Sequence, residues 1–174
     1  MYHISIYFDE DTNQKIRNHI NQIEKVTGNV HMTEGNIPPH ITLSVFNISD
    51  EKIAKKVLEM VAKRLEKCEL NWVSVGTFLP YVLYIAPVLN QQLHHMSMTV
   101  YEELKKLENV EISKYYRPFQ WLPHTTVGKK LTKEQMGKAF DVMQKQFGPF
   151  KGTVTSIGLA KTNPYKNIAI VDLD

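Results

Sequence analysis

The stretches "IPPHITLSVF", residues 37–46, and "RPFQWLPHTTVGKK", residues 117–130, decide the fold predicted for this chain. Both contain Pro-His, then any residue, then Thr, then an apolar residue, so His40 is paired with Thr42 and His124 with Thr126. Residues i and i+2 of a strand point to the same face, so each histidine should share a face with its threonine. Two such copies far apart in one chain predict a site that is built twice.

The bare His-x-Ser/Thr pattern is weak, because His31 and His95 also fit it. His40 and His124 differ from these in having a preceding proline that ends a loop and a following β-branched strand. His95 falls in a predicted helix, where residues i and i+2 do not face the same way. Either motif alone is explained most simply as a strand-end histidine followed by a β-favouring threonine. The pair of motifs at matching positions in the two halves is not explained in this way.

Each half of the chain predicts the same order of elements around its motif: strand, helix, motif strand, helix, strand. Alternating and helical periodicities predict strands over 2–8, 40–46 and 70–78 and helices over 11–27 and 51–69 in the first half. The second half predicts strands over 81–87, 124–128, 152–160 and 167–173 and helices over 93–107 and 131–147. Asn90 is the expected N-cap of one helix. Thr132 and Gln135 have capping-box spacing at the start of another.

The fold class that this order predicts is α+β, with two pseudo-symmetric lobes in one domain over residues 1–174. Its approximate halves are 1–80 and 81–174, and "FLPYVL" between them is too short and too apolar to be a linker. We therefore expect a continuous core. Approximate two-fold symmetry would bring equivalent strands face to face across a groove, where His40 and His124 could meet.

Composition limits the function classes. The 43% hydrophobic and 22% charged fractions are ordinary for a globular protein. A net charge of +3 is compatible with a phosphate-bearing ligand, but it is a smaller excess of positive charge than strong nucleic-acid binders usually have. The single cysteine, Cys68, cannot form an internal disulfide, which favours a reducing compartment. The sequence shows no signal peptide and no membrane-length apolar run, so we expect a soluble cytoplasmic protein.

Two histidines on opposite walls of a groove suit general acid–base catalysis. The unperturbed pKa of imidazole, about 6.5, lets one ring be neutral and the other charged near neutral pH. Threonine hydroxyls can donate hydrogen bonds to non-bridging phosphate oxygens. Two imidazoles and two hydroxyls therefore predict phosphoester chemistry that needs no metal and no cofactor.

The paired motifs "PHITL" and "PHTTV", one in each half, resemble the 2H phosphoesterase superfamily and its 2'-5' RNA ligase-like and cyclic phosphodiesterase branch. The resemblance covers essentially the whole chain through the order of elements, and only the motif strands match closely. It implies a bilobal α+β fold, with two antiparallel sheets flanked by helices around a central groove. It also implies metal-independent phosphodiesterase activity on 2',3'-cyclic phosphates or 2'-5' linkages, with hydrolysis ranked above ligation.

Carried onto this sequence, the resemblance implies that His40 and His124 are the catalytic acid and base, in an order that the sequence leaves open. Thr42 and Thr126 would bind the substrate phosphate, and Lys129 is the candidate for a supporting phosphate contact. Members of the superfamily also stack bases on aromatic residues, for which the candidates here are Phe46, Trp121 and Tyr84. The expected partner is a nucleotide or an RNA end, with no membrane partner and a monomeric chain.

Two alternatives remain at the level of the sequence. One is a non-catalytic RNA- or nucleotide-binding module with the same groove, although binding alone would not need an acid and a base. The other is a metal-dependent hydrolase with the histidines as ligands, although neither motif brings the carboxylate or third ligand that such sites usually have. Resistance of the activity to a chelator would distinguish the metal-independent phosphodiesterase from the metal-dependent hydrolase. His3 and Tyr7 share a strand face that could line the groove, although a structural role is the simpler interpretation of His3.

Overall fold

The computed structural model describes residues 1–35, 37–162 and 164–174. The strands are β1 (Tyr2–Phe8), β2 (Ile41–Asn47), β3 (Cys68–Phe78), β4 (Val82–Pro87), β5 (Glu111–Ile112), β6 (Thr125–Gly128), β7 (Phe150–Lys161) and β8 (Lys166–Asp172). The helices are α1 (Glu10–Thr27), α2 (Glu51–Ala62), α3 (Gln91–Lys105) and α4 (Lys133–Gln146), with one turn of 3-10 helix at Lys114–Tyr116. The predicted α+β class is confirmed.

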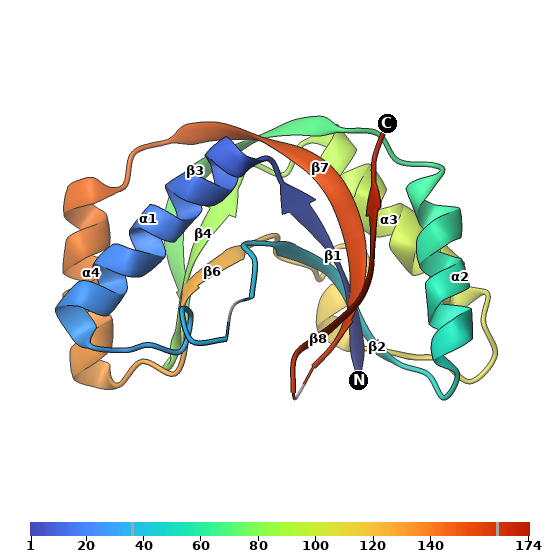
Figure 1. Cartoon of the computed structure of the whole chain (residues 1–174), viewed down its shortest axis with the longest axis horizontal. Helices are drawn as coiled ribbons and strands as arrows, with labels where there is room; N and C mark the ends of the chain where they lie inside the picture. Colours follow the sequence, from blue (N-terminus) through green and yellow to red (C-terminus); the bar gives the residue numbers. More distant parts are fainter. Residues whose placement is uncertain (36, 163) are drawn as a thin grey trace.

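One long strand, β7, joins what we expected to be two separate antiparallel sheets. The described strands form a single antiparallel sheet in the order β5-β2-β1-β7-β3-β4-β6, with β8 on the side of β7. Residues 154–161 of β7 pair with β1, whereas residues 150–154 pair with β3. Because its 12 residues reach across both lobes, β7 makes the sheet continuous. The two expected sheets are therefore two wings of one sheet (Figure 1).

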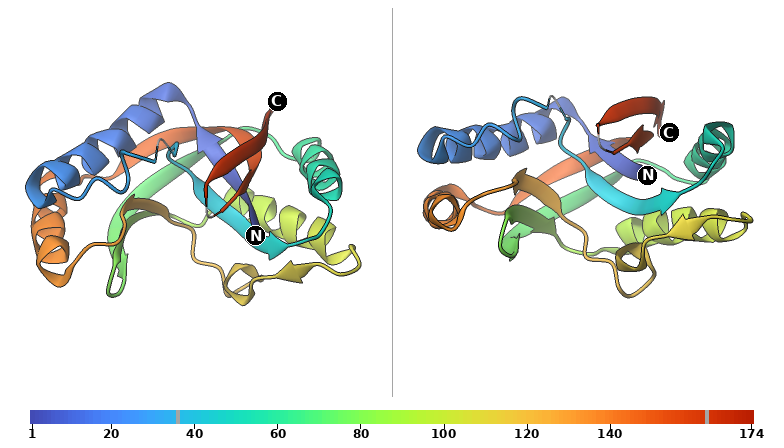
Figure 2. Two further views of the ribbon diagram at one scale, coloured as in Figure 1. Left: turned by 60° about the horizontal axis from the view of Figure 1, so that its bottom comes forward. Right: turned by 90° about the horizontal axis from the view of Figure 1, so that it is seen from below.

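The helices cover the two wings in pairs that mix the halves of the chain. α1 packs against α4 and β6, while α2 packs against α3 and β7, and α3 contacts β2. In Figures 1 and 2, α1 and α4 lie at one end of the molecule and α2 and α3 at the other. Each wing thus combines elements from 1–80 with elements from 81–174.

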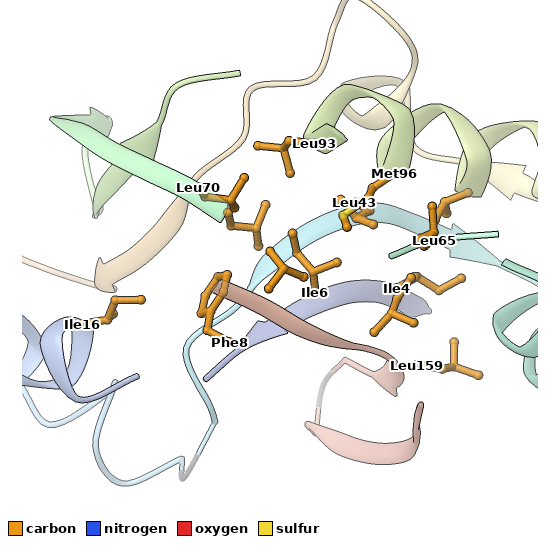
Figure 3. Close-up of a cluster of buried hydrophobic side chains, with 14 of the residues drawn as sticks. Ile4, Ile6, Phe8, Ile16, Leu43, Leu65, Leu70, Leu93, Met96 and Leu159 are labelled. Atoms are coloured by element: carbon orange, nitrogen blue, oxygen red, sulfur yellow. The ribbon is translucent and has the colours of Figure 1, made fainter. Parts of the chain in front are cut away.

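A single hydrophobic cluster runs between the strands and the helices. Figure 3 shows Ile4 and Ile6 of β1 beside Leu43 of β2, with Met96 of α3 packed over them. The alternation predicted for β1 is correct for Ile4 and Ile6, which are fully buried. The opposite face of β1 is buried as well, because β1 is a central strand whose other face lies under the candidate site described below.

Three helical predictions need correction at their edges. α2 ends at Ala62 instead of continuing to residue 69, and Cys68 already begins β3. Its buried stripe contains Ala54 and Val57, so Ile53 and Met60 face solvent. The helical spacing of apolar residues predicts that Ile53 and Met60 are buried, and likewise Val26 of α1 and Phe140 of α4, but all four are exposed. The periodicity of apolar residues predicts the presence of each helix correctly. The elements that pack against the helix decide which of its apolar residues are buried.

The helix caps agree with the sequence. The Asn90 side chain accepts a hydrogen bond from the Leu93 amide at 2.8 Å. Thr132 and Gln135 form the predicted reciprocal capping box. The two-residue strand β5 was not predicted, because two residues carry no periodic signal. It pairs with Phe46 and Asn47 of β2 and thereby ties the segment before the second motif to the first motif strand.

Two glycines provide an opposed pair of stability predictions. A Cβ at Gly76 would lie 2.5 Å from the Tyr84 ring, whereas a Cβ at Gly137, within α4, would meet nothing within 4 Å. We expect Gly76→Ala to lower the free energy of unfolding by about 1–3 kcal/mol through overpacking. Gly137→Ala should raise it by up to ~1 kcal/mol through helix propensity. Urea denaturation measures both, and changes of the same sign would contradict this description of the packing around Tyr84.

Candidate active site

His40 and His124 have the same local geometry at the same place in their wings. Each lies immediately before its motif strand, β2 or β6. The Nδ1 atom of His40 is 2.8 Å from the carbonyl oxygen of Pro38, and Nδ1 of His124 is 2.9 Å from that of Leu122. A carbonyl oxygen only accepts hydrogen bonds, so Nδ1 carries the proton in both rings. Each neutral imidazole then has its Nε2 lone pair free to accept a proton.

One groove of about 340 Å³ contains both histidines. Thr126 and Lys129, two of the other residues predicted for the site, line the same groove. The remaining lining residues are His31, Met32, Ile37, Phe78, Val82 and Lys130. A larger cavity of about 420 Å³ lies between the end of α2 and the start of α3 and contains no motif residue. The geometry of the motifs, and not cavity size, therefore selects the groove as the candidate site.

Thr42 does not line the groove in this structure. It is half-buried, and its hydroxyl oxygen accepts a hydrogen bond from the Ser5 hydroxyl at 3.2 Å. Its carbonyl oxygen accepts a hydrogen bond from Trp121 Nε1 at 2.9 Å. Thr42 is thus held by two hydrogen bonds, one at its hydroxyl oxygen and one at its carbonyl oxygen. The second bond connects it to Trp121, in the loop that precedes the second motif.

The register of the strands repeats around the two motifs. Ser5 of β1 lies opposite Thr42 of β2, and Tyr84 of β4 lies opposite Thr126 of β6. On the other side, Ser5 faces Gly158 of β7 and Tyr84 faces Gly76 of β3. The wings therefore correspond in their strand order and differ in the side chains behind each threonine.

The surroundings of His40 are polar and partly aromatic. Its ring centroid lies 5.7 Å from that of His3 and 6.2 Å from that of Tyr7. Burial lowers the pKa of His40, and the nearby His124 and Lys129 lower it further, while the Pro38 carbonyl opposes them. Burial and, secondarily, His40 lower the pKa of His3 to about 4. Both rings are therefore neutral at pH 7 without a ligand.

The surroundings of His124 are aromatic. Phe78 meets its ring edge-on with centroids 4.8 Å apart, and the Tyr84 centroid is 5.4 Å away. Burial lowers the pKa of His124, against the effect of the Leu122 carbonyl. The two catalytic candidates thus share a hydrogen-bonding pattern but have different neighbours.

A second cavity of about 300 Å³ adjoins the groove and shares Phe78 and His124 with it. Its other lining residues are Tyr115, Tyr116, Gln120, Trp121 and Leu122. Among the predicted base-stacking residues, Trp121 lines this cavity. The Tyr84 ring contacts both Phe78 and His124, which also contact each other. Phe46 is fully buried and stacked on Tyr2, so it cannot contact a base, and that candidate was wrong.

Sequence reasoning missed several residues of the groove and of the second cavity. The sequence predicts Phe78 only as part of a strand, and His31 fits the His-x-Ser/Thr pattern without the preceding proline and following strand of the two motifs. Tyr115 and Tyr116 lie in a segment without periodicity, next to β5. Their aromatic character was the only signal, because their position depends on the pairing of β5 with β2.

Within the described residues, no group of three or more His, Cys, Asp and Glu side chains is placed to hold a metal ion. None of the helices described here has the length and apolar character needed to cross a membrane.

A sequence profile of the 2'-5' RNA ligase superfamily matches residues 12–165. The chain belongs to this superfamily. The matched range includes both Pro-His motifs, and membership supports a phosphodiesterase-type function. No protein of curated function is similar enough in sequence to count as a match.

Solved structures of 2H phosphoesterases have the same fold. LigT of Escherichia coli in complex with 3'-AMP superposes with a TM-score of 0.62 at 14% identity, with 99% of this chain and 97% of LigT covered. TT0787 of Thermus thermophilus gives a TM-score of 0.63 at 14% identity and the same coverage. A structure described as a phosphoesterase gives 0.62 at 15% identity, again with 99% and 97% covered. The predicted resemblance to the 2H phosphoesterase superfamily is confirmed, as is the predicted pseudo-symmetric α+β fold, although its strands form one sheet and not two.

The lowered histidine pKa values predict how stability depends on pH. A group whose pKa is lower in the folded state than in the unfolded state stabilises the protein above the unfolded value of about 6.5 and loses this effect as pH falls below it. Between pH 8 and pH 5, His3 alone should lower the free energy of unfolding by about 2 kcal/mol. Urea titrations at several pH values should show this loss, and His3→Asn should reduce it.

His95→Asn, at an exposed position in α3, is the matched control and should keep the natural pH dependence. A natural protein whose stability is flat from pH 8 to pH 5 would contradict the burial of neutral histidines in the candidate site.

Proposed function

We propose that the protein is a metal-independent phosphodiesterase that hydrolyses 2',3'-cyclic phosphate or 2'-5'-linked nucleotide or RNA substrates. The observation that carries the proposal is the matched pair of histidines in one groove, each with Nδ1 bonded to a carbonyl oxygen and Nε2 left free. A ring held this way can exchange a proton only through Nε2. This arrangement supports the assignment of the two rings as the acid and the base that act on one phosphate bound in the groove.

In the proposed reaction, Nε2 of one neutral imidazole takes a proton from water as the water oxygen bonds to phosphorus. The bond from phosphorus to one ribose oxygen breaks, and Nε2 of the other ring, which is protonated, gives its proton to that oxygen. The product is a phosphomonoester with a free ribose hydroxyl. The first ring ends protonated and the second neutral, and exchange with solvent restores the starting state.

The electrostatics of the groove fit this cycle. Burial disfavours the charged form of both rings in the free protein. A bound phosphate brings a negative charge that favours imidazolium, so the substrate itself supports the protonated acid. Lys129 lines the groove and adds a positive charge for the non-bridging oxygens. The hydroxyl of Thr126, which lines the groove, is a proposed phosphate ligand. Thr42 does not line the groove but is only half-buried two residues beyond His40, and we propose its hydroxyl as the second such ligand once phosphate is bound.

The second cavity suggests where the nucleoside lies. It shares His124 with the groove, and Tyr116 and Trp121 are among its lining residues. Aromatic rings stack on any base, with a contribution of about 1–3 kcal/mol per base. LigT, similar in fold, has been crystallised with 3'-AMP, with NADP+ and with ATP. We place the base of the substrate in this cavity and its phosphate between the histidines.

The test is turnover of 2',3'-cyclic nucleotides and of short 2'-5' and 3'-5' oligonucleotides in the presence of EDTA. We expect activity that survives the chelator and falls by about 10² to 10⁴ in His40→Ala and in His124→Ala, because each removes one proton transfer. His95→Ala should retain the natural rate. Turnover abolished by EDTA would favour a metal-dependent hydrolase. Absence of turnover, with equal nucleotide binding by all variants, would replace the proposal with a non-catalytic binding module.

The pH dependence of kcat/KM provides a second test. It reports the pKa values of the acid and the base in the free enzyme. Because both histidine pKa values are lowered from about 6.5, the bell-shaped profile should have its optimum below pH 6.5. Rates for a 2',3'-cyclic nucleotide between pH 4 and pH 9, at constant ionic strength, measure it. An optimum above pH 7.5 would contradict this assignment of the acid and base.

A further inference from the structure

A chain of three side chains runs from the interior of β1 to the first motif threonine. Nδ1 of His3 lies 2.8 Å from the Ser5 hydroxyl oxygen, and the Ser5 hydroxyl donates to the Thr42 hydroxyl oxygen at 3.2 Å. His3 is 5% exposed and Ser5 is fully buried. Neither residue lines the groove, so the proposed catalytic reaction does not yet explain why two polar groups are buried here.

Counting the protons fixes the direction of these hydrogen bonds. A phosphate oxygen only accepts hydrogen bonds, so Thr42 must use its one hydroxyl proton to bind phosphate. The Thr42 oxygen can then only accept from Ser5, which uses the one proton of Ser5. The Ser5 oxygen must therefore accept from His3, and the proton of the neutral His3 ring must be on Nδ1. Burial of His3, which lowers its pKa and keeps the ring neutral, is consistent with this tautomer.

The second wing lacks this arrangement. The residue opposite Thr126 is Tyr84, whose ring packs on Phe78 and His124. Among the described residues, no side-chain hydrogen bond to the Thr126 hydroxyl is present. Thr42 is also held through its carbonyl oxygen by Trp121. The two threonines, equivalent in the motif, are therefore unequal in how firmly their hydroxyls are oriented.

We propose that His3 and Ser5 are positioning residues that fix the Thr42 hydroxyl as a hydrogen-bond donor to the substrate phosphate. This inference rests on the proposed phosphodiesterase function and adds residues that the motifs do not contain. A donor that is oriented before the reaction stabilises developing charge without reorganising. If the Ser5 hydroxyl is removed, the Thr42 hydroxyl can rotate, and it donates its hydrogen bond to other acceptors part of the time.

A double-mutant cycle on kcat/KM for a 2',3'-cyclic nucleotide tests the proposal. Ser5→Ala should lower kcat/KM roughly five- to twentyfold, through loss of one hydrogen bond that orients a donor. In a Thr42→Val background the same change should have less than about a twofold effect, because the group through which Ser5 acts is already absent. In a Thr126→Val background its effect should persist in full. Equal effects of Ser5→Ala in all three backgrounds would overturn the proposal.

Substitutions of His3 separate positioning from packing. His3→Asn retains an N–H donor near the position of Nδ1 and should keep most of the activity, whereas His3→Leu removes the donor and should match Ser5→Ala. Thermal unfolding of each variant establishes that it is folded. If His3→Leu is folded and as active as the natural protein, the chain of side chains has no positioning role.

Nitrogen-15 NMR of labelled histidine tests the chain of hydrogen bonds without any turnover. The natural protein should show His3 as a neutral ring protonated on Nδ1 at pH 7, and Ser5→Ala should weaken that preference. An Nε2-protonated His3 would overturn the proposed direction of the hydrogen bonds. A protein that has the predicted His3 tautomer but no turnover would instead refute the proposed function, while the hydrogen-bonded chain itself remains.

Discussion

The pairing of β7 with both β1 and β3 is the constraint on which the rest of the structure depends. Its last residues hold β1, which carries β2 and the first motif, and its first residues hold β3, which carries β4 and the second motif. A strand is a stiff connection, because each residue makes backbone hydrogen bonds to its neighbours. The distance between the two histidines is therefore set by one continuous sheet and not by a hinge between lobes.

Within that frame, the prolines and carbonyl groups before each motif prepare both histidines in the same way. Pro39 and Pro123 are buried, and the carbonyl of the residue before each proline accepts the Nδ1 proton of the histidine after it. This bond fixes the tautomer and the direction of the ring at once. The symmetry ends there, since polar groups of β1 lie behind Thr42 and the aromatic Tyr84 lies behind Thr126. The two copies of the motif therefore have the same histidine geometry but different residues behind their threonines. Such a difference suits a reaction in which one ring gives a proton and the other takes one.

The predictions from the sequence succeeded where the signal is local. The strand at 2–8, the helix that follows it and the capping box at Thr132 and Gln135 agree with the structure to within a residue or so. These features depend on periodicity and on hydrogen bonds between residues close in the chain. The predictions failed where coverage by distant elements decides, as for Val26, Met60 and Phe140, which continue an apolar stripe beyond the surface that covers it. The two-residue strand β5 and the cavity formed by Tyr115, Tyr116 and Trp121 had no local signal at all.

The sequence by itself determined the α+β class, the duplicated Pro-His-x-Thr motif and the residues that are candidates for phosphoester chemistry, because residue type and spacing carry that information. Only the tertiary structure decided that the two expected sheets are one and that α1 covers the wing of the second motif. It also decided that His3 and Ser5 lie behind Thr42. These relations join residues far apart in the chain, and they depend on which strands pair and in which register. Backbone hydrogen bonding permits many such pairings, and only the packing of the whole core selects one.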